Sequence, residues 1–165
     1  MIDLTSTPII ILVILGSVGV ALPVISIALK ERPSMMSYGI ATLIAMFASI
    51  GYVLYQIALE HVAPAAIFSQ DVLVDDAFGS LFAIAMLIVA IFTTIGSFSY
   101  MKNKANPSVY FSLILLSTIG MVLVAYSTDL VMLFVAWELM SIPTYILVGF
   151  LKKDPISNEA AIKYF

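Results

Sequence analysis

Five long apolar runs constrain this chain more than any other feature of its sequence. They cover about residues 8–29, 35–59, 77–100, 107–127 and 130–151, and shorter polar segments separate them. Each run is close to the ~20 residues that an α-helix needs to cross a hydrocarbon core of about 30 Å. Because lipid offers no hydrogen-bond partners, such a segment must satisfy its backbone groups internally, as a helix does. The sequence therefore predicts an all-α integral membrane protein with five transmembrane helices and the start of a sixth.

Composition supports this class and excludes several kinds of site. Hydrophobic residues make up 62% of the chain and charged residues 10%, whereas soluble domains hold roughly 45–50% and about 25%. The absence of cysteine excludes thiolate metal sites and iron–sulfur ligation. The single histidine, His61, excludes a histidine cluster. We therefore expect no metal site and no redox centre in this chain, and we expect contact with a lipid bilayer and none with nucleic acid.

The charged residues alternate in sign from one inter-helix segment to the next. Every basic residue follows the first, third or fifth run: Lys30, Arg32, Lys102, Lys104, Lys152, Lys153 and Lys163. The opposite ends hold only acids: Asp3, Glu60, Asp71, Asp75, Asp76 and Asp129. Basic segments stay on the cytoplasmic side of a membrane. The pattern predicts a multi-pass protein of the cell inner (cytoplasmic) membrane with its N-terminus outside.

Local signals mark the ends of the fifth run. Asp129 is a favourable N-cap for a helix over 130–151, since its carboxylate can accept the first free backbone N–H groups. Pro143 should kink this helix, because proline has no N–H to donate one turn back. Ser157 or Asn158 is predicted to cap the sixth helix.

An acidic side chain, Glu138, lies near the middle of the fifth apolar run. Charged groups cost about 2.5–3.5 kcal/mol at a helix centre on insertion scales, so they are functional by default. Helical spacing places Ser141 and Tyr145 on the same face as Glu138, which predicts a polar path. Desolvation favours the neutral carboxyl and a basic partner favours the ionised one. The group could therefore take up and release a proton; the alternative is a silent, hydrogen-bonded structural acid.

Lys163 is a basic residue within an apolar helical stretch at the end of the chain. It is expected near the cytoplasmic end, whereas Glu138 lies at mid-membrane, so a direct ion pair is not expected. We predict that Lys163 is a relay or a neighbour in a hydrated proton path. The alternative is a lysine that extends its side chain to the interface.

The run DLVMLFVAWELMSIPTYILVGF, followed by SNEAAIKYF, resembles the antiporter-like subunits of respiratory complex I and their relatives. These relatives include membrane-bound hydrogenases and multisubunit cation/proton antiporters. Within the family the chain is most similar to subunit N, a group that includes an archaeal reduced-deazaflavin dehydrogenase. The resemblance is specific over about residues 110–165 and general, in helix count and orientation, before that.

The resemblance implies a fold and a division of labour. It implies the N-terminal part of a 14-helix antiporter-like fold, with three helices in residues 1–106 and the start of the first helical repeat in 107–165. Glu138 and Lys163 match the family's proton-translocating residues. The family pairs the matching glutamate with a lysine on a broken seventh helix, which would lie beyond residue 165, so the chain is expected to be truncated. The implied role is a non-redox, proton-translocating subunit of an NADH-quinone oxidoreductase type of enzyme.

The resemblance also implies partners. These are other membrane and peripheral subunits, which would hold the flavin, the iron–sulfur clusters and the quinone-type acceptor. The donor stays open between NADH, ferredoxin and a reduced deazaflavin, and the acceptor between a quinone and a phenazine. The alternative functions are a subunit of a cation/proton antiporter or membrane-bound hydrogenase, and a structural membrane scaffold.

Overall fold

The computed structural model describes residues 6–29, 34–59, 72–102, 104–151 and 155–164. These residues form six helices: α1 (Thr7–Ala28), α2 (Met35–Ala58), α3 (Ala77–Tyr100), α4 (Pro107–Tyr126), α5 (Leu130–Val148) and α6 (Pro155–Tyr164). His61 and several of the charged residues named above lie outside the described residues: Asp3, Lys30, Arg32, Glu60, Asp71, Lys152 and Lys153.

The all-helical prediction is confirmed over the described part of the chain. Helices α1 to α5 are each long and apolar enough to cross a membrane, by length and composition. The only β pairing among the described residues is an isolated antiparallel bridge between Leu73 and Ser127. Helix α3 has the predicted bounds, whereas α5 ends at Val148 and not at residue 151.

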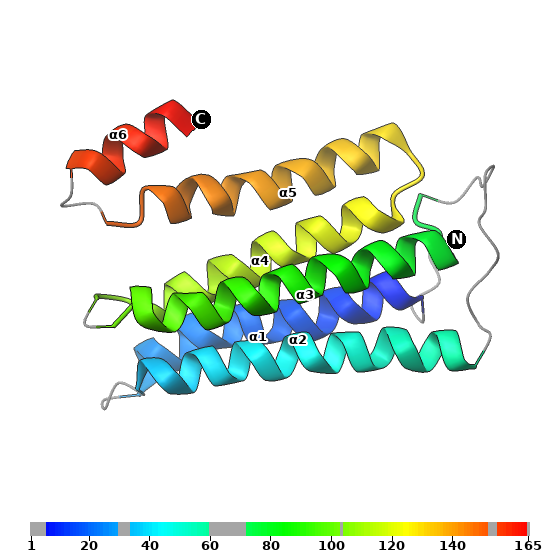
Figure 1. Ribbon diagram of the computed structural model, residues 1–165, viewed down its shortest axis with the longest axis horizontal. Coiled ribbons are helices and arrows are strands. Elements are labelled where there is room, and N and C mark those ends of the chain that lie inside the picture. Colours follow the sequence, from blue (N-terminus) through cyan, green and yellow to red (C-terminus); the bar gives the residue numbers. More distant parts are fainter. Residues whose placement is uncertain (1–5, 30–33, 60–71, 103, 152–154, 165) are drawn as a thin grey trace.

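Helices α1 to α5 run alternately up and down, and α4 contacts each of the other four. Helix α5 lies along α4, and α6 packs on the side of α5 that faces away from the bundle (Figure 1). The packed side chains centre on α4, where Phe111, Leu115 and Tyr126 are fully buried. We call the end of the bundle with Lys102 and Lys104 the basic end, and the end with Asp75, Asp76 and Asp129 the acidic end. The described charges are thus segregated as the sequence predicted.

A contact between α1 and α4 supplies a hydrogen bond to a carbonyl of α1 that has no donor within its own helix. Pro23 lies inside α1 and cannot donate to the carbonyl of Gly19, one turn earlier. The hydroxyl of Ser112, on α4, donates to that carbonyl instead. A backbone oxygen that would be unpaired in an apolar slab therefore becomes an inter-helix contact.

Two neighbouring carboxylates organise the acidic end. Asp76 caps α3, since its Oδ1 accepts a hydrogen bond from the Gly79 N–H at 2.7 Å. Asp75 reaches across the bundle, where its Oδ2 accepts from the backbone N–H of Thr7 at 2.9 Å. Asp75 therefore joins the start of α1 to the segment that enters α3.

Removing the Asp75 carboxylate should loosen the start of α1. We expect Asp75→Ala to lower the free energy of unfolding by about 1.5–3 kcal/mol, because a hydrogen bond to a charged acceptor is lost. Asp75→Asn keeps an acceptor oxygen for the Thr7 N–H and should lose less. Thermal unfolding of the detergent-purified protein measures both. Equal stability of Asp75→Ala and the unaltered protein would show that this bond does not hold α1.

Candidate functional site

Helix α5 carries the candidate site, and its start is fixed by Asp129. The Oδ2 atom of Asp129 accepts from the backbone N–H groups of Val131 at 2.9 Å and Met132 at 3.2 Å. This confirms the predicted N-cap. The helix continues through Pro143, which is buried. At about 1.5 Å per residue, Leu130–Val148 is nearly as long as the hydrocarbon core is thick.

Glu138 lies near the middle of α5, and its side chain is half-buried. Among the described residues, no side chain or backbone group forms a hydrogen bond or ion pair with the Glu138 carboxyl. The residues one turn before it are open to the surroundings: Phe134 is 65% exposed and Val135 is 51% exposed. The carboxyl is therefore at mid-helix, on the outer side of the bundle, without a partner in the described part of the chain.

The face that carries Glu138 is the one on which α6 packs. Tyr145, two turns after Glu138, contacts Tyr164 of α6 with ring centroids 5.6 Å apart. One turn further on, a Cβ added to Gly149 would lie 2.9 Å from the Ala161 Cβ. Helical spacing predicts that Tyr145 and Glu138 share a face, and this grouping stays a prediction. The contact of Tyr145 with α6 could not be read from spacing alone.

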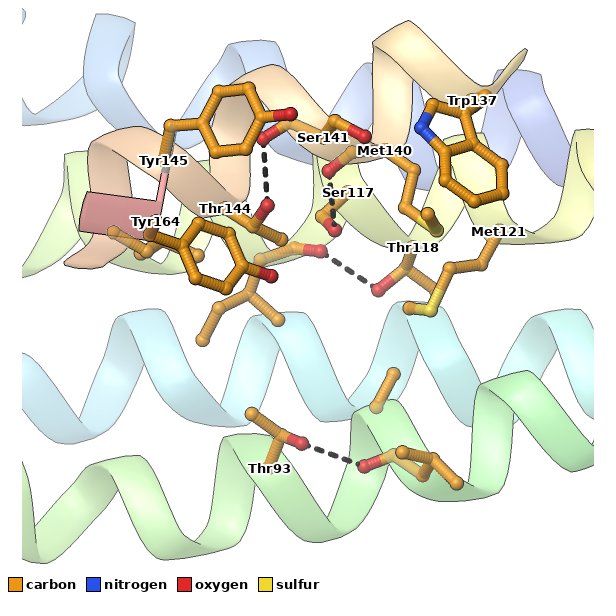
Figure 2. A pocket seen from close by; sticks show the side chains of 14 residues that line it. Thr93, Ser117, Thr118, Met121, Trp137, Met140, Ser141, Thr144, Tyr145 and Tyr164 are labelled. Carbon is orange, nitrogen blue, oxygen red and sulfur yellow. Dashed lines mark hydrogen bonds between the residues drawn. The ribbon is translucent and has the colours of Figure 1, made fainter. Parts of the chain in front are cut away.

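A cavity of about 490 Å³ opens beside this face, between α3, α4, α5 and α6. Figure 2 shows the hydroxyl-bearing side chains in its wall, which are Thr93, Ser117, Thr118, Ser141, Thr144, Tyr145 and Tyr164. Ser141 and Tyr145, both predicted as members of a polar path, thus line one cavity. Glu138 does not line it, because Glu138 lies further around α5.

Several of the cavity hydroxyls bond to backbone carbonyls on their own helix. Thr118 donates to the Ile114 carbonyl at 2.8 Å, and Thr144 donates to the Ser141 carbonyl at 2.6 Å (Figure 2). The hydroxyl of Ser117 instead crosses to α5 and donates to the Met140 carbonyl at 3.1 Å. A hydroxyl that donates to a carbonyl can still accept a hydrogen bond. The cavity wall can therefore receive water or a protonated group.

Lys163 pairs within its own helix. Its Nζ lies 2.6 Å from Oε1 of Glu159, one turn earlier, and the two side chains are 73% and 65% exposed. Glu159 was not singled out from the sequence as a partner of Lys163. The Glu-to-Lys spacing of four residues is the signal that could have found it. Lys163 and Glu138 form no ion pair, and exposed pairs such as Lys163–Glu159 contribute little to stability.

The start of α6 differs from the prediction. The helix begins at Pro155, so neither Ser157 nor Asn158 is its N-cap. Proline suits the first turn of a helix, because its missing N–H is not needed there. Ser157 satisfies α5 instead: its hydroxyl donates to the Val148 carbonyl at 2.8 Å. This bond closes the end of α5 and fixes α6 against it.

No group of three or more His, Cys, Asp or Glu side chains is placed to hold a metal ion in the described residues. The described part of the chain offers a different kind of site. A carboxyl at mid-membrane depth and a cavity with hydroxyl groups lie on adjoining sides of one spanning helix. This arrangement defines the class of the protein: a multi-pass membrane protein with an intramembrane acid.

Comparison with known proteins agrees with that class. Residues 127–165 match the family described as "NADH:quinone oxidoreductase/Mrp antiporter, TM". The chain is 34% identical over 154 residues to "NADH-quinone oxidoreductase subunit N 1" of Solibacter usitatus, which covers 93% of this chain and 30% of that protein. It is 34% identical to "NADH-quinone oxidoreductase subunit N" of Desulfitobacterium hafniense, over 98% of this chain and 31% of that protein.

An archaeal protein matches a shorter part of the chain. "F(420)H(2) dehydrogenase subunit N" of Methanosarcina mazei is 39% identical over 99 residues, which are 60% of this chain and 20% of that protein. The resemblance to the antiporter-like subunit N family is confirmed by these matches. The chain spans about three tenths of the length of the relatives that it matches over nearly all of its own. The family match begins at residue 127, so the predicted domain boundary after residue 106 stays a prediction.

The Ser157–Val148 bond should control how α6 is held. We expect Ser157→Ala to weaken the junction of α5 and α6 by about 1 kcal/mol, since one hydrogen bond to a helix-end carbonyl is lost. Ser157→Thr keeps the hydroxyl and serves as the matched control. Hydrogen exchange of the α6 amides measures the change. If α6 exchanges equally fast in the alanine variant and the unaltered protein, the bond does not hold the junction.

Proposed function

We propose that this chain is the proton-translocating part of a subunit N in a complex I-like dehydrogenase, and that Glu138 carries the proton. The observation that supports this most is the position of the Glu138 carboxyl. It lies at the middle of a spanning helix, half-buried, and finds no partner in the described residues. An intramembrane acid without a partner is costly, and such residues are functional by default. Such a group can load and release a proton as its surroundings change.

The proposal assigns different roles to the surrounding residues. Ser141 and Tyr145 would form part of a polar path beside the cavity, and Pro143 would kink α5 next to it. Lys163, paired with Glu159 one turn earlier in α6, would be a station near the cytoplasmic end of the path. Glu138 would need a basic partner that the described residues do not supply. The bundle would sit in the cytoplasmic membrane with its acidic end outside.

The proposed protein is a non-redox subunit of an oxidoreductase. Other membrane and peripheral subunits would hold the flavin and iron–sulfur clusters and pass electrons to a quinone-type acceptor. Glu138 would respond to that electron transfer by exchanging a proton. The matches to "NADH-quinone oxidoreductase subunit N" and "F(420)H(2) dehydrogenase subunit N" support this proposal. The family description also names antiporters, which keeps a cation/proton antiporter subunit as the second candidate.

Glu138→Gln tests the proposed function in the assembled complex reconstituted into vesicles. We expect the complex to assemble and to transfer electrons at least in part, while the number of protons moved per electron falls, because glutamine cannot exchange a proton. Asp76→Asn is the matched control, since it removes a carboxyl but keeps a good N-cap for α3. Normal proton-to-electron stoichiometry in Glu138→Gln would refute the assignment of Glu138.

The same preparation separates the alternatives. Redox subunits with flavin and iron–sulfur clusters should purify with the protein if it belongs to a dehydrogenase. An antiporter subunit would purify without them. A structural scaffold would tolerate Glu138→Leu with no transport defect, because a leucine in its place removes the cost of a buried acid.

The role of Lys163 gives a separate test. We expect Lys163→Met to slow proton translocation and Lys163→Arg to retain more of it, because arginine keeps the positive charge. Stability should change little in both, since the Lys163–Glu159 pair is exposed. Initial rates of donor-driven acidification in vesicles measure the effect. An unchanged rate in Lys163→Met would mean that the lysine only reaches the interface.

A further inference from the structure

The structure assigns Gly120 and Ser117 of α4 as positioning residues for Glu138, an inference that rests on the proposed function. These two residues hold the backbone of α5 at the turn that follows Glu138. We call them the α4 clamp. Neither residue bonds to Glu138, although Ser117 also lines the cavity. We infer that both act by fixing how α5 is rotated.

At Gly120, α4 lies very close to the α5 backbone. It is buried, and a Cβ added to it would lie 2.7 Å from the Met140 Cα and 2.8 Å from the Leu139 carbonyl carbon. Real Cβ atoms are not found at such distances, and the atoms concerned are backbone, so they could not move aside as a flexible side chain does. Any side chain at Gly120 would therefore displace α5.

Ser117 supplies the second contact of the clamp, one turn earlier on the same helix. Its hydroxyl donates to the Met140 carbonyl at 3.1 Å (Figure 2), and Ser117 is only 5% exposed. Residues three apart share a face of a helix. Ser117 and Gly120 therefore hold one short stretch of α5, at Leu139 and Met140, by a hydrogen bond and by close packing.

The clamp lies on the side of α5 away from Glu138. An α-helix turns by about 100° per residue, so Leu139 and Met140 are rotated by about 100° and 200° from Glu138. Pro143 leaves the Leu139 carbonyl without its in-helix donor, so this turn has fewer internal bonds than the rest of α5. Contact from α4 is then the main restraint on its rotation. Held in this way, Glu138 is directed to the face on which α6 packs.

Small movements at this point should matter to proton exchange. Functional groups need to be held to within about 0.5 Å and 10–20°. Several titratable groups lie on the helices that pack against α5, so a rotation would change the surroundings of the Glu138 carboxyl. Those that the structure describes are Tyr110 and Tyr126 on α4 and Glu159, Lys163 and Tyr164 on α6.

Gly120→Ala tests the clamp in the assembled complex, with Gly96→Ala as the matched control. A Cβ at Gly96, on α3, would meet nothing within 4 Å, so both variants add one methyl group to a spanning helix. The measurement is donor-driven proton translocation in vesicles as a function of pH, together with electron transfer. We expect Gly120→Ala to shift the pH midpoint of translocation and to slow it, by up to about a hundred-fold for a 1 Å displacement. Gly96→Ala should behave as the unaltered protein does.

Ser117 keeps the test decisive if Gly120→Ala does not assemble. Ser117→Ala removes the bond to the Met140 carbonyl and should shift the pH midpoint in the same direction, whereas Ser117→Thr keeps a hydroxyl and should restore it. An unshifted pH profile in Ser117→Ala and in any assembled Gly120→Ala would overturn the clamp. If the clamp variants keep an unshifted pH profile but Glu138→Gln translocates fewer protons, the clamp is wrong and the proposed function still holds. Normal stoichiometry in Glu138→Gln would instead refute the proposed function itself.

Discussion

An unpaired polar group is costly in the apolar interior of this bundle, and pairing such groups across helices fixes several of its inter-helix contacts. Pro23 leaves the Gly19 carbonyl unpaired in α1, and the hydroxyl of Ser112 on α4 pairs with it. The hydroxyl of Ser117 reaches the Met140 carbonyl of α5 in the same way. Because lipid offers no water to replace such a bond, each one fixes how two helices sit together.

Glu138 differs from the other unpaired groups of the described residues, which are the hydroxyls of Thr7 and Tyr38 and one oxygen of Asp75. It is an acid near the middle of a spanning helix. The nearby hydroxyls of Ser117 and Thr144 are paired with backbone carbonyls, but the Glu138 carboxyl finds no partner there. One side of α5 is held by α4, and the other carries Glu138 toward α6. Helix α5 is therefore held by α4 on one side, while on its other side the surroundings of the Glu138 carboxyl can change. This is the arrangement that a proton carrier needs, because its carboxyl must meet different surroundings in turn.

Features that depend on local chemistry could be predicted from the sequence. The length of the apolar runs placed the spanning helices, because lipid imposes the same requirement on each of them. Asp129 was predicted as an N-cap, because a cap binds backbone groups two and three residues away. Features that depend on contact between distant segments could not be predicted. Ser157 has the chemistry of an N-cap, yet it donates to the Val148 carbonyl of the preceding helix. The close approach at Gly120 likewise depends on which helix lies opposite.

The central claim is that Glu138 changes its protonation state during turnover. Infrared difference spectroscopy of the assembled complex, recorded before and after adding the electron donor, observes the carbonyl stretch of protonated carboxyl groups directly. We expect a protonated-carboxyl band that changes on turnover, that is missing in Glu138→Gln and that persists in Asp76→Asn. A band that is identical in Glu138→Gln and in the unaltered protein would show that another carboxyl carries the proton, and would contradict this account.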